Sequence, residues 1–237
     1  MDLDQVQVVG LHAAQALLED FRLEQLAQDF KKLNCESDFD LEGACFILAK
    51  IEYPELNIQQ YVNKIDGLAL EAEQRVYGVD EDRDKVKVIN HFLFEEKGFR
   101  GNEKSYYEPE NSYINKVLDR QTGIPISLSA IYLFLARRLN LPVDGVGFPG
   151  HFLLKYRSDS RPFFIDAFNS GQILSQQDCK HFIKKMGYTF YPYYLNTSES
   201  RDILARMIRN LVLIFLQKNQ QNKIDTLERI FSEFVMN

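Results

Sequence analysis

A histidine and an aspartate on two neighbouring apolar segments are the residues best placed for acid–base chemistry. His151 follows the turn Gly147-Phe148-Pro149-Gly150, and Asp166 lies on the next apolar segment. In such a pair the carboxylate accepts a hydrogen bond from one imidazole nitrogen, which fixes the tautomer and leaves the other nitrogen facing a groove. We expect His151 and Asp166 to be the catalytic pair of any such site; the alternative is a polar pair that only joins two strands.

The order of a helix, a His strand and an Asp strand resembles a papain-type or transglutaminase-type triad, which implies a cysteine nucleophile at the helix N-terminus; that cysteine is missing here. The helix before the histidine begins Gly123-Ile124-Pro125, and no cysteine lies between Cys45 and Cys179. A cysteine at a helix N-terminus is activated because the helix dipole and an adjacent imidazole favour its thiolate. Pro125 has neither a sulfur nor an N–H that could stabilise an oxyanion. The sequence therefore predicts that thiol acyl transfer is absent at this position.

Two other residues are candidate replacements for the missing nucleophile. Ser127 lies two positions into the helix, where its hydroxyl could reach His151 or bond to the preceding turn of backbone. Cys45 lies in the N-terminal part of the chain, and core packing is the favoured interpretation because free cysteines are among the most buried residues. The alternative function is thus an amidase or acyltransferase that uses Ser127 or Cys45 with His151 and Asp166.

The segments around the pair predict a helix packed on an antiparallel sheet. Residues 125–139 are apolar nearly all round, with Pro125 in the first turn and Asn140 after the last. A second helix is predicted at 176–186. The predicted strands, all short and apolar, are 143–148, 151–156, 162–167 and an edge strand at 188–194.

Helices are also predicted on both sides of this core. Residues 1–34 predict a helix with the apolar stripe Leu11, Ala14, Leu17, Leu18, Phe21 and Leu26. Further helical patterns begin at Asp40 and Asn57, and the segment 99–112 predicts an ordered loop over the central site. After Ser200, two apolar stripes separated by a polar turn predict a helical hairpin.

The order of helix, histidine strand and aspartate strand resembles the transglutaminase-like core, whose pattern is Gly-x-Cys, a helix, a His strand and an Asp strand. Counting back from Leu141-Pro142 places the cysteine of that family on Pro125. A wider similarity, over roughly residues 35–190, is to the bacterial SirB-type family, in which a transglutaminase-like domain without the cysteine precedes tetratricopeptide repeats. The residues that carry this similarity are Glu52-Tyr53-Pro54, Gly98-Phe99-Arg100-Gly101-Asn102, Asn111-Ser112-Tyr113, Gly147-Phe148-Pro149-Gly150-His151 and Asp166.

The resemblance implies an α+β fold with a transglutaminase-like, or papain-like, core in which an antiparallel sheet packs on a central helix. We divide the chain into an N-terminal helical subdomain (1–98), the core (99–195) and a tetratricopeptide-like helical hairpin (196–237). One such hairpin cannot bury its own apolar face, so it must pack on the core or on another chain. The groove around the pair is expected to be lined by Arg100, Asn102, Asn111, Tyr113, Pro125, Ser127 and Asn169.

Composition excludes several functional classes. The 237 residues are 45% hydrophobic, which is enough for a substantial core. The net charge of −6, from 28 basic and 34 acidic residues, argues against binding to nucleic acid or to an anionic membrane. No segment has the pattern of a signal peptide or a membrane helix. Cys35, Cys45 and Cys179 lack the spacing of a disulfide scaffold or a zinc site, so we expect a cytoplasmic protein without metal or cofactor.

These observations favour a pseudoenzyme, a non-catalytic interaction or regulatory module that keeps a His–Asp groove. Its expected partner is a protein or peptide, or a small ligand held beside His151. The enzyme alternative predicts an activity that is lost on His151→Ala and on substitution of one nucleophile. A weaker third hypothesis is that the C-terminal hairpin binds another protein through an exposed apolar groove, and burial of residues 203–231 would count against it.

Overall fold

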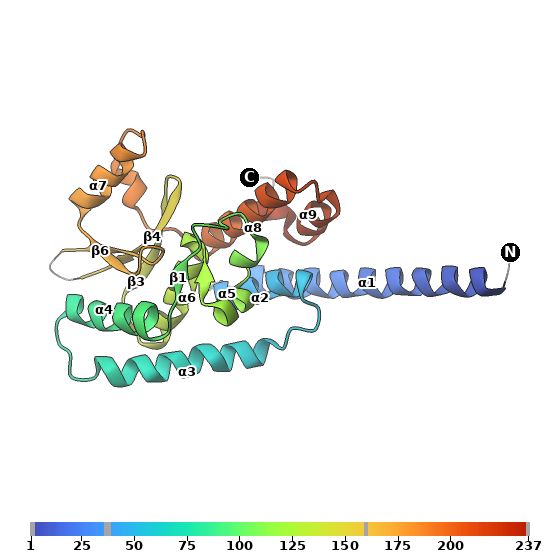
Figure 1. The fold of residues 1–237 in the computed structure, drawn as a ribbon, viewed down its shortest axis with the longest axis horizontal. Coiled ribbons are helices and arrows are strands. Elements are labelled where there is room, and N and C mark those ends of the chain that lie inside the picture. The colour runs from blue at the N-terminus through green and yellow to red at the C-terminus, as the bar shows by residue number, and fades with distance from the viewer. Residues whose placement is uncertain (1–2, 36–38, 159–160, 236–237) are drawn as a thin grey trace.

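The computed structural model describes residues 3–35, 39–158 and 161–235, with side chains described at 12–33, 39–158 and 161–232. The N-terminal part is helical, as predicted, and its third and fourth helices run along one side of the molecule (Figure 1). In chain order these elements are α1 (Leu3–Cys35), α2 (Leu41–Glu52), α3 (Ile58–Val76), α4 (Asp82–Asn90) and the π-helical turn η1 (His91–Glu96).

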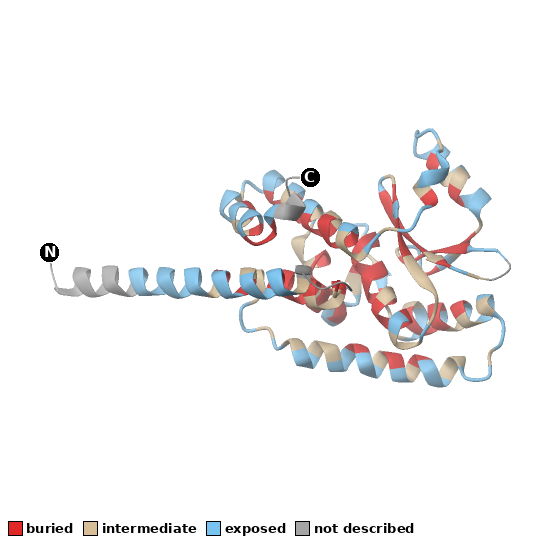
Figure 2. Cartoon of the chain, turned by 180° about the vertical axis from the view of Figure 1, so that it is seen from behind, coloured by how far each residue is buried: buried red, intermediate tan, exposed pale blue. Residues whose placement is uncertain are grey.

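The first half of α1 extends away from the rest of the molecule (Figures 1 and 2). Leu17 and Leu18 are each 70% exposed and Phe21 is 62% exposed, whereas Leu26 is buried. Most of the predicted apolar stripe is therefore uncovered, because periodicity identifies a face without showing that another element packs on it; the side chain of Leu11 lies outside the described residues. Although α1 has 33 residues, no helix in the described ranges is apolar enough over the necessary length to cross a membrane.

A short parallel pairing joins the predicted loop to the start of the central helix. The elements here are β1 (Arg100–Gly101), η2 (Pro109–Asn111), α5 (Ile114–Arg120), β2 (Thr122–Gly123) and α6 (Pro125–Arg138). β1 pairs with β2, and α6 follows β2 at once. The structure confirms the central helix with Pro125 in its first turn, and Asn140 adopts the positive φ of +53° expected after its last turn.

Four strands form an antiparallel meander in which each strand pairs with the next. They are β3 (Val143–Phe148), β4 (His151–Tyr156), β5 (Phe163–Asp166) and β6 (Gln172–Leu174), and α7 (Gln176–Lys185) follows them. Alternate side chains point to opposite faces of the sheet. Phe152 and Leu154 pack in the cluster that contains the apolar residues of α6, whereas Leu153 and Phe164 pack with Cys179 and Ile183 of α7. Each face of the sheet is thus covered by a helix.

The predicted edge strand at 188–194 is wrong. Residues Pro192–Leu195 form a turn of 3-10 helix, η3, and the rings of Tyr193 and Tyr194 contact each other at a centroid distance of 4.6 Å. Proline cannot donate to a strand ladder, which disfavours a strand at this point. The edge of β3 is instead covered by Ser198, whose N–H donates to the carbonyl of Gly145 at 2.8 Å.

The C-terminal hairpin packs on the rest of the molecule (Figure 2). It consists of α8 (Ser200–Gln217) and α9 (Gln221–Val235). The ring of Phe231 on α9 lies 4.5 Å from that of Phe30 on α1, and Met207 of α8 packs against Cys45 of α2. One hydrophobic cluster contains residues from all three predicted parts of the chain, so these parts share a single core.

Candidate functional site

The imidazole of His151 and the carboxylate of Asp166 are in direct contact. His151 is the first residue of β4 and Asp166 the last of β5, and Nε2 of the histidine lies 2.9 Å from Oδ1 of the aspartate. The turn before His151 is Pro149-Gly150, and Gly150 has a φ of +65°, which favours glycine at this position. Both side chains are buried, with exposures of 8% and 3%. The structure thus brings together the two residues singled out by the sequence.

Further hydrogen bonds hold the Asp166 carboxylate in place. Oδ1 also accepts from the backbone N–H groups of Phe168 and Asn169, at 3.1 and 3.2 Å. The side-chain amide of Asn169 donates to Oδ2 at 2.8 Å, so Asn169 contacts the carboxylate of the pair. Burial alone would raise the pKa of Asp166, but the bonds to His151 and Asn169 outweigh burial and leave the pKa below its usual value. The carboxylate is therefore ionised at neutral pH.

Two aromatic rings flank the imidazole. Phe168 follows β5, and its ring centroid lies 6.0 Å from that of His151 with the planes nearly perpendicular. Phe182 of α7 lies 5.4 Å away, again nearly perpendicular. Sequence reasoning missed both rings, and no local signal identifies them, because their positions depend on how α7 and the 168–171 turn pack on the sheet.

The pair lies on the face of the sheet that α7 covers. Residues two apart on a strand share a face, so His151 lies on the side of Leu153, and Asp166 on the side of Phe164. Both of these apolar side chains pack with α7. Helix α6 packs with Phe152 and the other side chains of the opposite face. The sheet therefore separates the imidazole from the body of the helix that would carry a nucleophile.

A cavity of about 320 Å³, here named the α7 cavity, adjoins Asp166, the carboxylate partner of His151. Its lining combines two carboxylates, two amides, an imidazole and three apolar side chains, from Asp166, Asn169, Gln172, Ile173, Leu174, Asp178, His181 and Phe182. No lysine or arginine lines it, so the cavity suits a polar or positively charged group. Within the described ranges, no group of three His, Cys, Asp or Glu side chains is arranged to hold a metal ion.

The N-terminus of α6 offers no reactive group to His151. Pro125 is buried at the first helical position. The Ser127 hydroxyl is fully buried, donates to the carbonyl of Asn111 at 2.6 Å and accepts from the N–H of Ile124 at 3.0 Å. The hydroxyl is thus bonded to backbone groups and is not exposed to an open groove.

The remaining predicted groove residues do not gather around the histidine. Asn111 is fully buried, and its side chain bonds to the carbonyl of Ser105 and to the Asn102 amide within the loop. Tyr113 is buried against the ring of Tyr53, 5.4 Å away. Arg100 is exposed on β1. The acidic side chains near it in sequence pair with other residues: Glu95 with His91, Glu96 with Arg75 and Asp119 with Lys64.

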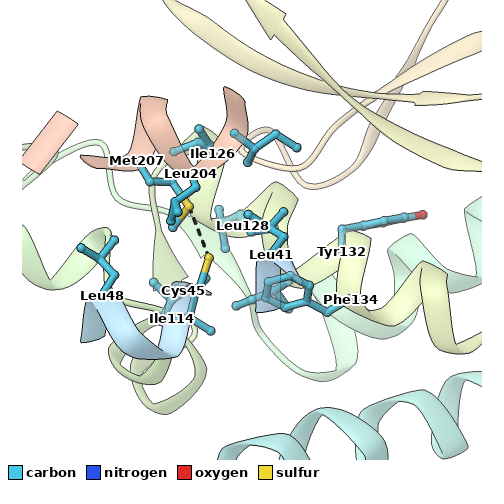
Figure 3. Close-up of a cluster of buried hydrophobic side chains, with 14 of the residues drawn as sticks. Leu41, Cys45, Leu48, Ile114, Ile126, Leu128, Tyr132, Phe134, Leu204 and Met207 are labelled. Carbon is cyan, nitrogen blue, oxygen red and sulfur yellow. Dashed lines mark hydrogen bonds between the residues drawn. The ribbon is translucent and has the colours of Figure 1, made fainter. Parts of the chain in front are cut away.

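Cys45 is a core residue (Figure 3). Its side chain is 1% exposed, and its sulfur lies 3.7 Å from that of Met207 among leucine and isoleucine side chains. Burial, with a smaller contribution from Glu42, raises the pKa of the Cys45 thiol. Burial likewise raises the pKa of Cys179, to about 12. Neither is poised as a thiolate; the side chain of Cys35 lies outside the described residues.

Comparison with known proteins places the chain in a family. A model of the transglutaminase-like superfamily matches residues 59–209. The UPF0162 protein of Xylella fastidiosa is 32% identical over 189 residues, covering 77% of this chain and 67% of that protein. The UPF0162 protein of Vibrio cholerae is 29% identical over 194 residues, covering 78% and 71%.

A third relative is much longer than this chain. F-box only protein 21 of Homo sapiens is 35% identical over 135 residues, covering 54% of this chain and 21% of that protein. No solved structure matches. The superfamily model covers more than half of the chain, and the mixed helical and antiparallel-sheet architecture fits it. The chain belongs to the transglutaminase-like superfamily.

Proposed function

We propose that this chain is a non-catalytic binding module whose ligand is held beside the His151–Asp166 pair. The observation that carries the proposal is the set of groups around the imidazole. Asp166 bonds to it and two phenylalanine rings flank it, while no thiol or hydroxyl of the described residues forms a hydrogen bond with it. An oriented imidazole without a nucleophile can recognise a ligand but cannot form an acyl intermediate.

The start of α6 supports the same conclusion. In thiol-dependent acyl transfer, the nucleophile and a backbone N–H act together on the reacting carbonyl. Pro125 supplies neither, and the Ser127 hydroxyl is already bonded to Asn111 and Ile124. Cys45 is enclosed in the core between α2 and α8. These contacts disfavour the alternative of an amidase or acyltransferase.

The α7 cavity is the proposed place for the ligand. It adjoins Asp166 and Phe182 and combines polar and apolar walls, as recognition sites for peptides and small molecules do. The occupant is a protein or peptide segment, or a small ligand. The match to 21% of F-box only protein 21 supports a modular role, because a related segment there forms one part of a longer chain.

Finer assignments within the superfamily are part of this proposal. We infer a SirB-type protein of the cytoplasm with a tetratricopeptide-like hairpin, and treat 1–98, 99–195 and 196–237 as subdomains on one core. The third hypothesis, binding through an exposed apolar groove of the hairpin, is not retained. The apolar stripe of the hairpin is buried, from Ile203 and Met207 on α8 to Leu227 and Phe231 on α9, and only Leu213 and Leu216 are large exposed apolar side chains among its described residues.

Selection of peptides from a random library tests this function. Peptides are selected on the wild-type protein, those that also bind His151→Ala are removed, and one remaining peptide is titrated by calorimetry. We expect Asp166→Asn to weaken its binding by about tenfold, because the variant loses the hydrogen bond that orients the imidazole of His151. Arg161→Gln, a change at an exposed residue, is the control and leaves the affinity unchanged.

The same peptide separates binding from catalysis. After incubation with the wild-type protein, its mass is measured by mass spectrometry. An unchanged mass supports the binding module. Cleavage or deamidation that disappears in His151→Ala and in Ser127→Ala or Cys45→Ala would establish the enzyme and overturn the proposal.

A further inference from the structure

An arginine of the C-terminal hairpin holds the turn that leads to His151. Nη2 of Arg206, on α8, donates to the carbonyl of Phe148 at 3.0 Å and to the carbonyl of His151 at 2.7 Å. These carbonyls flank the Pro149-Gly150 turn, so one nitrogen of the guanidinium binds both ends of the turn. The same guanidinium lies over the ring of Phe152, 5.6 Å from its centroid.

The other half of this guanidinium has no partner in the described part of the chain. Nη1 and Nε of Arg206 form no hydrogen bond there and no ion pair. Arg209, one turn further along α8, is exposed and also lacks an ion pair among the described residues. Other arginines of the surface do pair with a carboxylate, among them Arg22, Arg75, Arg120, Arg138, Arg157 and Arg229.

The surroundings of Arg206 favour an additional negative charge. The residue is half-buried, and burial together with the positive charge of Arg209 lowers its pKa, which Tyr106 partly opposes. Nη1 lies beside the exposed Gly147 of β3, where a Cβ would be in van der Waals contact with it at 3.5 Å. A guanidinium presents its N–H groups in a planar fork that matches the two oxygens of a carboxylate or phosphate group.

We propose that Arg206 and Arg209 form a binding site for an oxyanion, a carboxylate or a phosphate group. Nη1 and Nε of Arg206 donate to the anion, and Arg209 adds the second positive charge. No side-chain carboxylate of the described residues occupies this position, so the anion comes from a ligand. The site is separate from the α7 cavity and does not depend on the proposed function.

Nuclear magnetic resonance of the arginine side chains tests the site. The Nε–Hε signals of protein labelled with ¹⁵N-arginine are followed while inorganic phosphate, or in a parallel titration acetate, replaces chloride at constant ionic strength. We expect a saturable shift of the Arg206 signal. If only phosphate gives a saturable shift, the site binds phosphate groups. If only acetate does, it binds carboxylates. If both do, it binds either group.

Variants make the test specific. Arg209→Gln changes an exposed residue and does not threaten the fold, and we expect it to weaken anion binding by about tenfold. Arg206→Lys identifies the Arg206 signal by its disappearance, and it also removes the planar set of guanidinium N–H donors. Arg161→Gln removes an exposed charge elsewhere and leaves the affinity unchanged. The absence of a saturable shift at Arg206, or equal affinities of Arg209→Gln and Arg161→Gln, would overturn the proposal.

Discussion

Nε2 of His151 lies 2.9 Å from Oδ1 of Asp166, and this contact fixes the orientation of the ring. An ionised carboxylate only accepts hydrogen bonds, so the proton of this contact is on Nε2. When the ring is neutral, Nδ1 therefore carries the lone pair. Nδ1 can then accept a hydrogen bond from a ligand, and no thiol or hydroxyl of the described residues is hydrogen-bonded to the ring.

Asp166→Asn is expected to change how stability depends on pH. Because the folded-state pKa of Asp166 is lowered, the carboxylate contributes stability above the usual carboxyl pKa of about 3.9, and the contribution is lost as pH falls through the folded-state value. Urea unfolding at neutral pH should show the variant less stable by about 1–3 kcal/mol. The difference from wild type should shrink in acid.

The matched control is Asp80→Asn, which removes one exposed negative charge far from the pair in sequence and corrects for the change in net charge. If the difference in unfolding free energy between wild type and Asp166→Asn stays constant down to acid pH, the proposed role of the ionised carboxylate is contradicted.

Ser127 and Ser129 allow a direct comparison of two buried hydroxyls on one helix. Ser127→Ala leaves the carbonyl of Asn111 and the N–H of Ile124 without their partner and should cost about 1–3 kcal/mol of unfolding free energy. The Ser129 hydroxyl is buried without a hydrogen-bond partner among the described residues, so Ser129→Ala should be neutral or stabilising. Equal effects in denaturant titrations would show that the Ser127 bonds contribute nothing.

Gly101→Ala should change the surroundings of His151 indirectly, by displacing Phe168. A Cβ at this position would lie 2.7 Å from the ring of Phe168 and 2.8 Å from its carbonyl oxygen, so Phe168, which contacts His151, must move. We expect a loss of about 1–3 kcal/mol and a change in the imidazole resonances of His151. Gly67 is an exposed residue of α3, and a Cβ added there meets no atom within 4 Å. Gly67→Ala should therefore stabilise the protein by about 0.5–1 kcal/mol.

Alkylation distinguishes a core thiol from a reactive one. Because burial raises the pKa of Cys45 and of Cys179, both should react with iodoacetamide far more slowly in the native protein than in concentrated guanidinium chloride. Mass spectrometry of the digested protein locates each modified cysteine. Rapid native alkylation of Cys45 that depends on His151 would support the enzyme alternative.

The sequence was most informative where local rules decide the structure. Proline in the first turn and asparagine after the last predicted the bounds of α6, and the alternation of apolar residues placed His151 and Asp166 on adjacent strands. Tertiary packing set the rest. The exposure of Leu17, the 3-10 turn at Pro192 and the approach of Phe182 to His151 depend on which element covers which face. Asn111 and Tyr113 were predicted beside the groove from proximity in sequence, but their side chains point to other partners.

The contact between α1 and α9 has a consequence for synthesis of the chain. Asp20 accepts a hydrogen bond from Arg229, 209 positions later, and Phe30 packs on Phe231. Ribosomes add about 5–20 residues per second, so α1 is made roughly 10–40 seconds before the helix that covers part of it. Throughout that interval the apolar side chains around Phe30 lack this cover. The order of synthesis therefore leaves this part of α1 without its native cover until the last helix of the described chain is made.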